Sequence, residues 1–133
     1  MSLILFLSLL AQAASALDYA EFKAKIQPLL TEKRPGHARC ITCHSTGTNL
    51  RLIRLPKGRT EYTDEESRKN FDAVSRFVLP GVPQKSRLLM MPLAHEAGGT
   101  EFHPGGKHWM SKDDAEWKTL SDWVQRASTT GRP

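Results

Sequence analysis

Three residues that can bind a metal or form covalent bonds lie within five positions of this sequence. Cys40 and Cys43 are the only two cysteines, and His44 follows the second directly. Two intervening residues allow both sulfur atoms to reach neighbouring edges of one flat ring system, and the next side chain then offers an imidazole to a metal at its centre. This Cys-x-x-Cys-His pattern is the attachment signature of c-type haem. We therefore predict one covalent haem c on Cys40 and Cys43, with His44 as the proximal iron ligand.

Two other chemistries use cysteines at this spacing. A Cys-x-x-Cys pair can exchange disulfides in a thioredoxin-like fold, but the sequence lacks the strand patterns of a βαβ unit. Zinc can be held by Cys40, Cys43 and two histidines, although the adjacency of Cys43 and His44 would crowd such a site. A structural zinc or interaction module is therefore kept as the weaker alternative.

Residues 1–16 carry no charged side chain and predict a signal peptide. The apolar run over residues 3–10 has the length of a signal-peptide core and is too short to cross a bilayer, and Ala14-Ser15-Ala16 offers a cleavage site. The predicted haem domain is residues 17–133, periplasmic or secreted and without a transmembrane span; the N-terminal segment is either cleaved or retained. Export supports haem attachment, because neighbouring thiols outside the cytoplasm would otherwise pair.

Length, composition and charge limit the number of domains and the classes of partner that are expected. The 133 residues predict a single domain, and the net charge is +5. Only about a third of residues 17–133 are apolar, so a bound cofactor is expected to help stabilise the fold. Basic residues gather in a predicted loop over residues 45–62, but no aromatic residues alternate with them, so nucleic acid is not predicted as a partner. We expect Arg51 and Arg54 in this loop to offset part of the negative charge of the haem propionates.

The remaining pattern predicts a small all-α domain. A first helix begins at the capping box of Asp18 and Glu21 and is expected to end or kink at Pro28. A second begins at the capping box of Thr63 and Glu66, a short turn covers residues 86–91, and a third runs from Ser111 towards Arg126. Residues 45–62 and 92–110 are predicted to be long loops, which more often serve a site than fill a core.

These features resemble the bacterial monohaem cytochromes c, in particular the planctomycete-type cytochrome c domain. The resemblance covers most of residues 20–127. It rests on the helix before the haem motif, on Cys40, Cys43 and His44, on the Pro-Gly-x-Pro-x-x-Ser-x-Leu stretch over residues 80–88, and on the closing amphipathic helix through Trp123. It implies a cytochrome c-like fold in which the first and last helices pack across each other beside one covalent haem.

The Cys-x-x-Cys-His motif does not determine which residue binds the opposite face of the iron. In the family it is usually a methionine before proline, ahead of the last helix, and His103-Pro104 occupies that location here. Met91-Pro92 keeps the dipeptide but lies only five residues after Ser86. We predict His103 as the distal ligand and keep Met91 as its alternative. Of the other downstream candidates, His95 and His108 are expected to be solvent-facing loop residues and Met110 to pack against the last helix; Met90 is the remaining candidate.

The predicted function is therefore an exported carrier of single electrons and not necessarily an enzyme. Its partners would be redox proteins or a membrane electron-transfer complex with an acidic docking surface. If none of the downstream residues reaches the iron, the alternative is a five-coordinate haem that binds or reduces a small molecule.

Overall fold

The computed structural model describes residues 16–37 and 39–127. Within these ranges the chain is helical or irregular and forms no β-strand, only isolated bridges that pair Arg34 with His37 and Leu93 with Trp109. The all-α prediction is thus confirmed. No helix in this part of the chain is long and apolar enough to cross a membrane. The predicted signal peptide, residues 1–16, lies outside the described residues except for Ala16.

The first helical segment is continuous but changes its winding midway. It consists of α1 (Tyr19–Glu21), a π-helical turn η1 (Phe22–Ile26) and α2 (Gln27–Thr31). The Asp18 side chain caps it as predicted, accepting a 2.8 Å hydrogen bond from the Glu21 amide. The helix does not end at Pro28. Proline cannot donate to the helical ladder and crowds the preceding turn, and the wider π turn directly before it accommodates both defects.

Two further helices begin at residues whose side chains cap them: α4 (Asp64–Ser75) and α6 (Ala115–Arg126). The Thr63 and Glu66 capping box begins α4 as predicted, whereas α6 begins four residues later than the predicted Ser111. Asp114 is the residue that caps α6, because its side chain accepts a 2.8 Å bond from the Glu116 amide while Ser111 caps only a turn. The full set is α3 (Cys40–Cys43), α4 (Asp64–Ser75), the 3-10 turn η2 (Pro83–Lys85), α5 (Arg87–Met90), the 3-10 turn η3 (His95–Ala97) and α6 (Ala115–Arg126).

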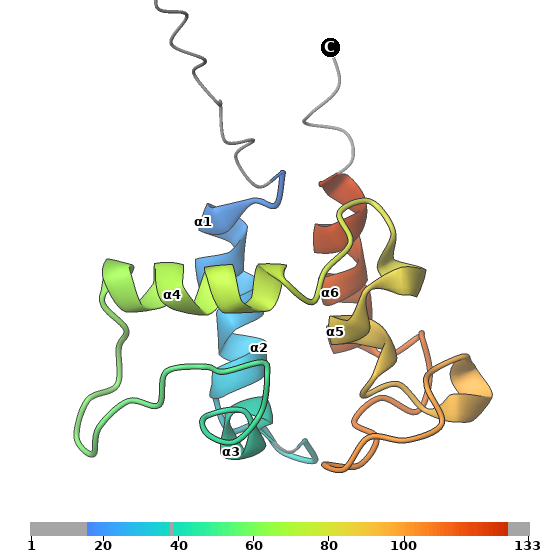
Figure 1. Cartoon of the computed structure of the whole chain (residues 1–133), viewed down its shortest axis with the longest axis horizontal. Coiled ribbons are helices and arrows are strands. Elements are labelled where there is room, and N and C mark those ends of the chain that lie inside the picture. The colour runs from blue at the N-terminus through green and yellow to red at the C-terminus, as the bar shows by residue number, and fades with distance from the viewer. Residues whose placement is uncertain (1–15, 38, 128–133) are drawn as a thin grey trace, which may run out of the picture.

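An aromatic cluster joins the two ends of the domain. The ring of Phe22 in η1 lies 5.9 Å from that of Trp123 in α6 and 5.3 Å from that of Phe71 in α4 (centroid distances), and the first two side chains are fully buried. The Trp123 indole N–H also donates to the Asp18 carbonyl at 2.9 Å. In Figure 1, α4 runs across the α1–α2 rod, with which it is in contact, and α3 lies beyond the end of α2. This packing fixes the Cys-x-x-Cys-His segment relative to the rest of the chain.

A buried polar chain anchors the extended segment that follows the haem motif. The Asn70 side chain in α4 accepts from the Ile53 amide at 2.8 Å and donates to the Gln27 side chain at 3.1 Å, and Gln27 donates to the Ser67 hydroxyl at 3.1 Å. Asn70 is fully buried, so each of these groups depends on its protein partner. The segment after His44 is thereby tied to both α2 and α4.

We expect replacement of Asn70 by alanine to destabilise the domain by about 3 kcal/mol. It would leave the Ile53 amide and the Gln27 amide oxygen without partners, at about 1–3 kcal/mol for each buried group. Urea unfolding of the purified protein measures this loss. The matched control is Asp72→Ala, an exposed change in the same helix, which is expected to stay within about 0.5 kcal/mol. Equal stability of the two variants would contradict the assigned role of the network.

Candidate cofactor site

A cavity of about 570 Å³ is lined by α3, the end of α2, α5 and the segment from Met91 to Trp109. Its volume falls within the roughly 300–1,000 Å³ of small-molecule and cofactor sites. All predicted site residues line it together: Cys40, Cys43, His44, Met91 and His103. The two sides of the cavity come from parts of the chain that are about sixty residues apart, and the fold brings them to the same end of the molecule.

His44 is held with one ring nitrogen free. Its Nδ1 lies 3.1 Å from the Leu50 carbonyl and 3.1 Å from the Thr48 hydroxyl, and the Thr48 hydroxyl donates to the same carbonyl. A carbonyl can only accept, so Nδ1 carries the proton and Nε2 keeps its lone pair. Metal-binding histidines are commonly oriented in this way by a backbone carbonyl. His44 is therefore prepared to bind a metal through Nε2.

His103 is prepared in the same way from the opposite wall. Its Nδ1 donates a 2.6 Å hydrogen bond to the Gly106 carbonyl, three residues later, which leaves Nε2 as the acceptor. Gly105 lies so close beneath the ring that an added Cβ would stand 3.3 Å from the His103 Cε1 and 4.0 Å from the Cys43 sulfur. The absence of a side chain at this position lets the loop bring His103 up to the cysteine-bearing helix.

The two imidazole rings are arranged as a pair. Their centroids are 6.2 Å apart, and their planes differ by only 13°. Two metal–nitrogen bonds of about 2.0–2.1 Å, added to the distance from each ring centre to its nitrogen, give a centroid separation of about 6 Å for imidazoles on opposite sides of one metal. The centroid separation of His44 and His103 is close to this value.

Met91 also lines the cavity, but its sulfur has another contact. The Thr100 hydroxyl lies 3.7 Å from the Met91 sulfur, and the Lys107 ammonium donates to the carbonyl oxygens of Met91 and Thr100. These bonds fasten the start of the 91–110 segment to its middle. Both predicted candidates for the distal position, His103 and Met91, therefore line the same cavity.

The remaining candidates have different positions. Met90 and the exposed His95 do not line the cavity, and Met110 is 65% exposed instead of packing against the last helix. The expectation that His108 faces solvent was wrong: it is half-buried, lines the cavity and lies 5.9 Å from the His103 ring. Burial and the neighbouring His103 lower the pKa of His108.

The charged side chains around the cavity are all positive. Lys33, Arg39 and Arg87 line it and are exposed, which places them at its rim, and no carboxylate among the described residues does so. The expectation that Arg51 and Arg54 offset part of the charge of haem propionates stays a prediction. Neither lines the cavity, and Arg54 donates instead to the carbonyl oxygens of Ile41 and Thr42. The cations that line the cavity come from other segments of the chain.

The cysteines differ in environment. Cys43 is exposed and Cys40 is half-buried, and burial, only partly offset by the nearby Arg34, raises the pKa of the Cys40 thiol to about 11. An unmodified Cys40 would therefore remain a neutral thiol at neutral pH. A thioether carries no proton to lose and is compatible with the same burial.

Comparison with protein-family models, with curated proteins and with solved structures finds no match to this chain.

Proposed function

We propose that this chain is an exported monohaem c-type cytochrome with a cytochrome c-like fold, which passes single electrons between redox partners. The observation that carries the proposal is the convergence of Cys40, Cys43, His44 and His103 on one cavity. Haem c would be attached through the two sulfurs, with His44 as proximal and His103 as distal ligand. Bound there, haem supplies a one-electron couple, and the protein binds it, orients it and sets its potential.

The chemistry of the walls fits this group. Haem is a large apolar ring with two carboxylates on one edge, and the cavity combines apolar walls with three rim cations and no described carboxylate. Arginine and lysine pair well with carboxylates, so Lys33, Arg39 and Arg87 are suited to hold the propionates. Placing the carboxylates at an exposed rim also avoids burying their charge.

The paired histidines favour electron transfer over small-molecule chemistry. Two imidazole ligands occupy both axial positions and leave none open for a substrate or gas. The five-coordinate alternative would leave His103 off the iron, whereas the His103 ring is held by the Gly106 carbonyl and its centroid lies 6.2 Å from that of His44. The proposed task is therefore that of a carrier.

The surface supports a negatively charged redox partner. Phe102 is 74% and Met110 65% exposed, and both lie in the segments that flank His103 and His108. These exposed apolar side chains add to the rim cations and to the net charge of +5. A partner with acidic residues around an apolar centre would complement them.

The test is production of the full chain in a bacterial host that exports it and attaches haem c. We expect a mass increase of one haem, cysteines that do not react with an alkylating reagent after denaturation, and a low-spin spectrum without an iron–sulfur charge-transfer band. Cys40→Ser/Cys43→Ser is expected to carry no covalent haem. Alkylatable cysteines together with stoichiometric zinc would overturn the proposal, and rapid binding of carbon monoxide by the reduced protein would support the five-coordinate alternative instead.

A further inference from the structure

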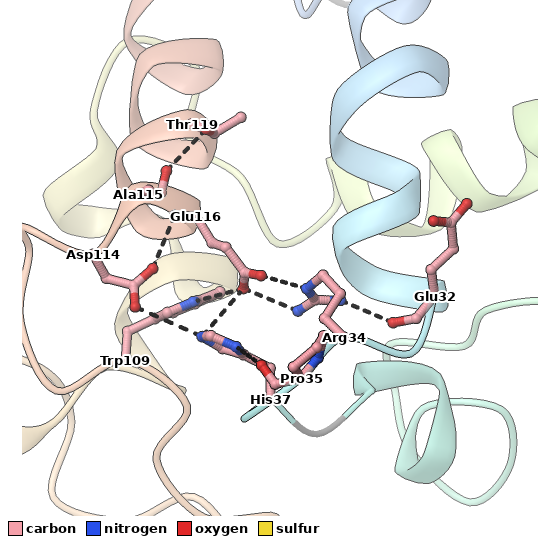
Figure 2. A network of polar contacts seen from close by, with 9 residues as sticks. All are labelled: Glu32, Arg34, Pro35, His37, Trp109, Asp114, Ala115, Glu116 and Thr119. Atoms are coloured by element: carbon pink, nitrogen blue, oxygen red, sulfur yellow. Dashed lines mark hydrogen bonds and ion pairs between the residues drawn. The ribbon is translucent and has the colours of Figure 1, made fainter.

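A network of charged residues lies next to the cavity wall. It joins the segment just before the haem motif to the start of α6 (Figure 2). The Glu116 carboxylate accepts hydrogen bonds from Arg34 Nε and from Arg34 Nη2, the latter at 2.9 Å, and from the Trp109 indole nitrogen at 3.4 Å. Trp109 and the neighbouring His37 both line the cavity itself. The network therefore extends from the proposed cofactor to the partly exposed Asp114.

His37 is the member of this network that can gain or lose a proton near neutral pH. Its Nδ1 donates to the Pro35 carbonyl at 3.1 Å, which points Nε2 at Asp114 Oδ2, 3.7 Å away, and at Glu116 Oε2, 3.8 Å away. A neutral imidazole in this tautomer would direct a lone pair at two carboxylates. A cation on Nε2 removes that repulsion, and it can be either a proton or a metal ion.

The surroundings favour a proton over a metal ion. His37, Asp114 and Glu116 can place three ligand atoms within 4.8 Å of one another, which is compatible with a divalent ion. Both oxygens of Glu116 are, however, already engaged by Arg34, and the second also by Trp109. With His37 protonated, two positive side chains oppose two carboxylates, whereas a divalent ion would have to displace the Arg34 pair.

We propose that His37 is a redox-linked proton site: it binds one proton from solvent when the proposed haem gains one electron from its donor, and it releases that proton when the electron leaves. This proposal rests on the proposed function. The gained electron removes one positive charge from a cavity that His37 lines, so a positive His37 is repelled less in the reduced protein. Because the coupling is reciprocal, a proton on His37 must favour reduction to the same extent.

The other charged groups around His37 are not expected to take up a proton when the haem is reduced, with the exception of His108. Lys33, Arg34 and Arg39, on its own segment, stay positive at ordinary pH. The two carboxylates of α6 stabilise the protonated imidazole. His108, from the 91–110 segment, lies 5.9 Å from the ring of the proposed ligand His103. Its protonation could also respond to the charge of the iron, and the variant His108→Gln tests this alternative. Histidine is the side chain that ordinarily titrates between pH 5 and 8.

The experiment measures the reduction potential of the haem-loaded full chain from pH 5 to 9. We expect the potential to fall as pH rises, by no more than about 59 mV for each tenfold change in proton concentration. His37→Gln is expected to flatten this dependence. Asp114→Asn is expected to move it to lower pH, because it removes one stabilising carboxylate while asparagine still caps α6. The matched control is His95→Gln, an exposed histidine that does not line the cavity, which should keep the wild-type curve.

A second readout follows the imidazole itself. Nuclear magnetic resonance should show His37 titrating at higher pH in the reduced than in the oxidised protein. The proposal is overturned if the wild-type potential is flat, if the dependence survives in His37→Gln, or if only His108→Gln removes it. Stoichiometric Zn²⁺ binding that disappears in His37→Gln and Asp114→Asn would replace the proton with a metal ion. If the exported chain contains no haem, the proposed function itself fails, and the spectrum reports this before any titration.

Discussion

Replacing His103 by methionine is expected to raise the reduction potential of the haem-loaded protein by on the order of 0.1 V. A thioether favours the ferrous state relative to an imidazole, and axial ligands are the strongest of the protein's controls on potential. The substitution should also introduce the iron–sulfur charge-transfer band that the wild-type spectrum is expected to lack. Potentiometric titration and a near-infrared spectrum measure the two effects.

The control for this experiment is Met91→Leu, which keeps the size of a cavity-lining side chain. Because the Met91 sulfur contacts the Thr100 hydroxyl, we expect the leucine variant to keep the wild-type potential and spectrum. His103→Ala should open the distal position, and added imidazole should restore the wild-type spectrum. If Met91→Leu alone altered the ligand spectrum while the His103 variants did not, Met91 would be the distal ligand.

The second large effect is expected in the aromatic cluster that joins the two ends of the domain. Trp123→Ala should lower the free energy of unfolding by about 3–5 kcal/mol, the cost of removing a fully buried aromatic side chain. Trp123 packs against Phe22 and Phe71 and donates to the Asp18 carbonyl. Urea unfolding of the haem-loaded protein, monitored by circular dichroism, measures the loss.

A matched pair of conservative changes separates packing from hydrogen bonding. Trp123→Phe keeps a ring but loses the bond to Asp18, and it should cost about 1–2 kcal/mol. Trp117 is also buried, but its indole N–H has no acceptor among residues 16–37 and 39–127. Trp117→Phe should therefore stay within about 1 kcal/mol of wild type. Equal losses in the two phenylalanine variants would show that the Asp18 bond contributes nothing.

Features governed by neighbouring residues were predictable from the sequence. The caps at Asp18 and Thr63 were confirmed because a cap needs only its own side chain and an amide three residues later. The start of α6 was misplaced because Ser111 and Asp114 compete within four residues, and the sequence does not indicate which one binds the helical amides. The π turn before Pro28 was missed because proline predicts a defect in the helix and not how the backbone accommodates it.

In the candidate site, too, the residues that lie close together in the sequence were predictable, and most of those brought in by tertiary packing were not. Cys40, Cys43 and His44 are brought together by the chain itself, so their spacing was sufficient to predict them. His103 was predicted only from its place before a proline, and the fold was required to bring its ring to 6.2 Å from that of His44. Lys33, His37, Arg39 and Arg87 line the cavity through tertiary packing. No local pattern marks them, and none was identified from the sequence.

The paired bonds between Arg34 and Glu116 have a consequence for the order in which the domain assembles. They connect residues 82 positions apart, so this side of the cavity cannot close before the start of α6 has been synthesised. Under the proposed function, haem would be joined to Cys40 and Cys43 before this wall closes, and closure would then bury the attached group.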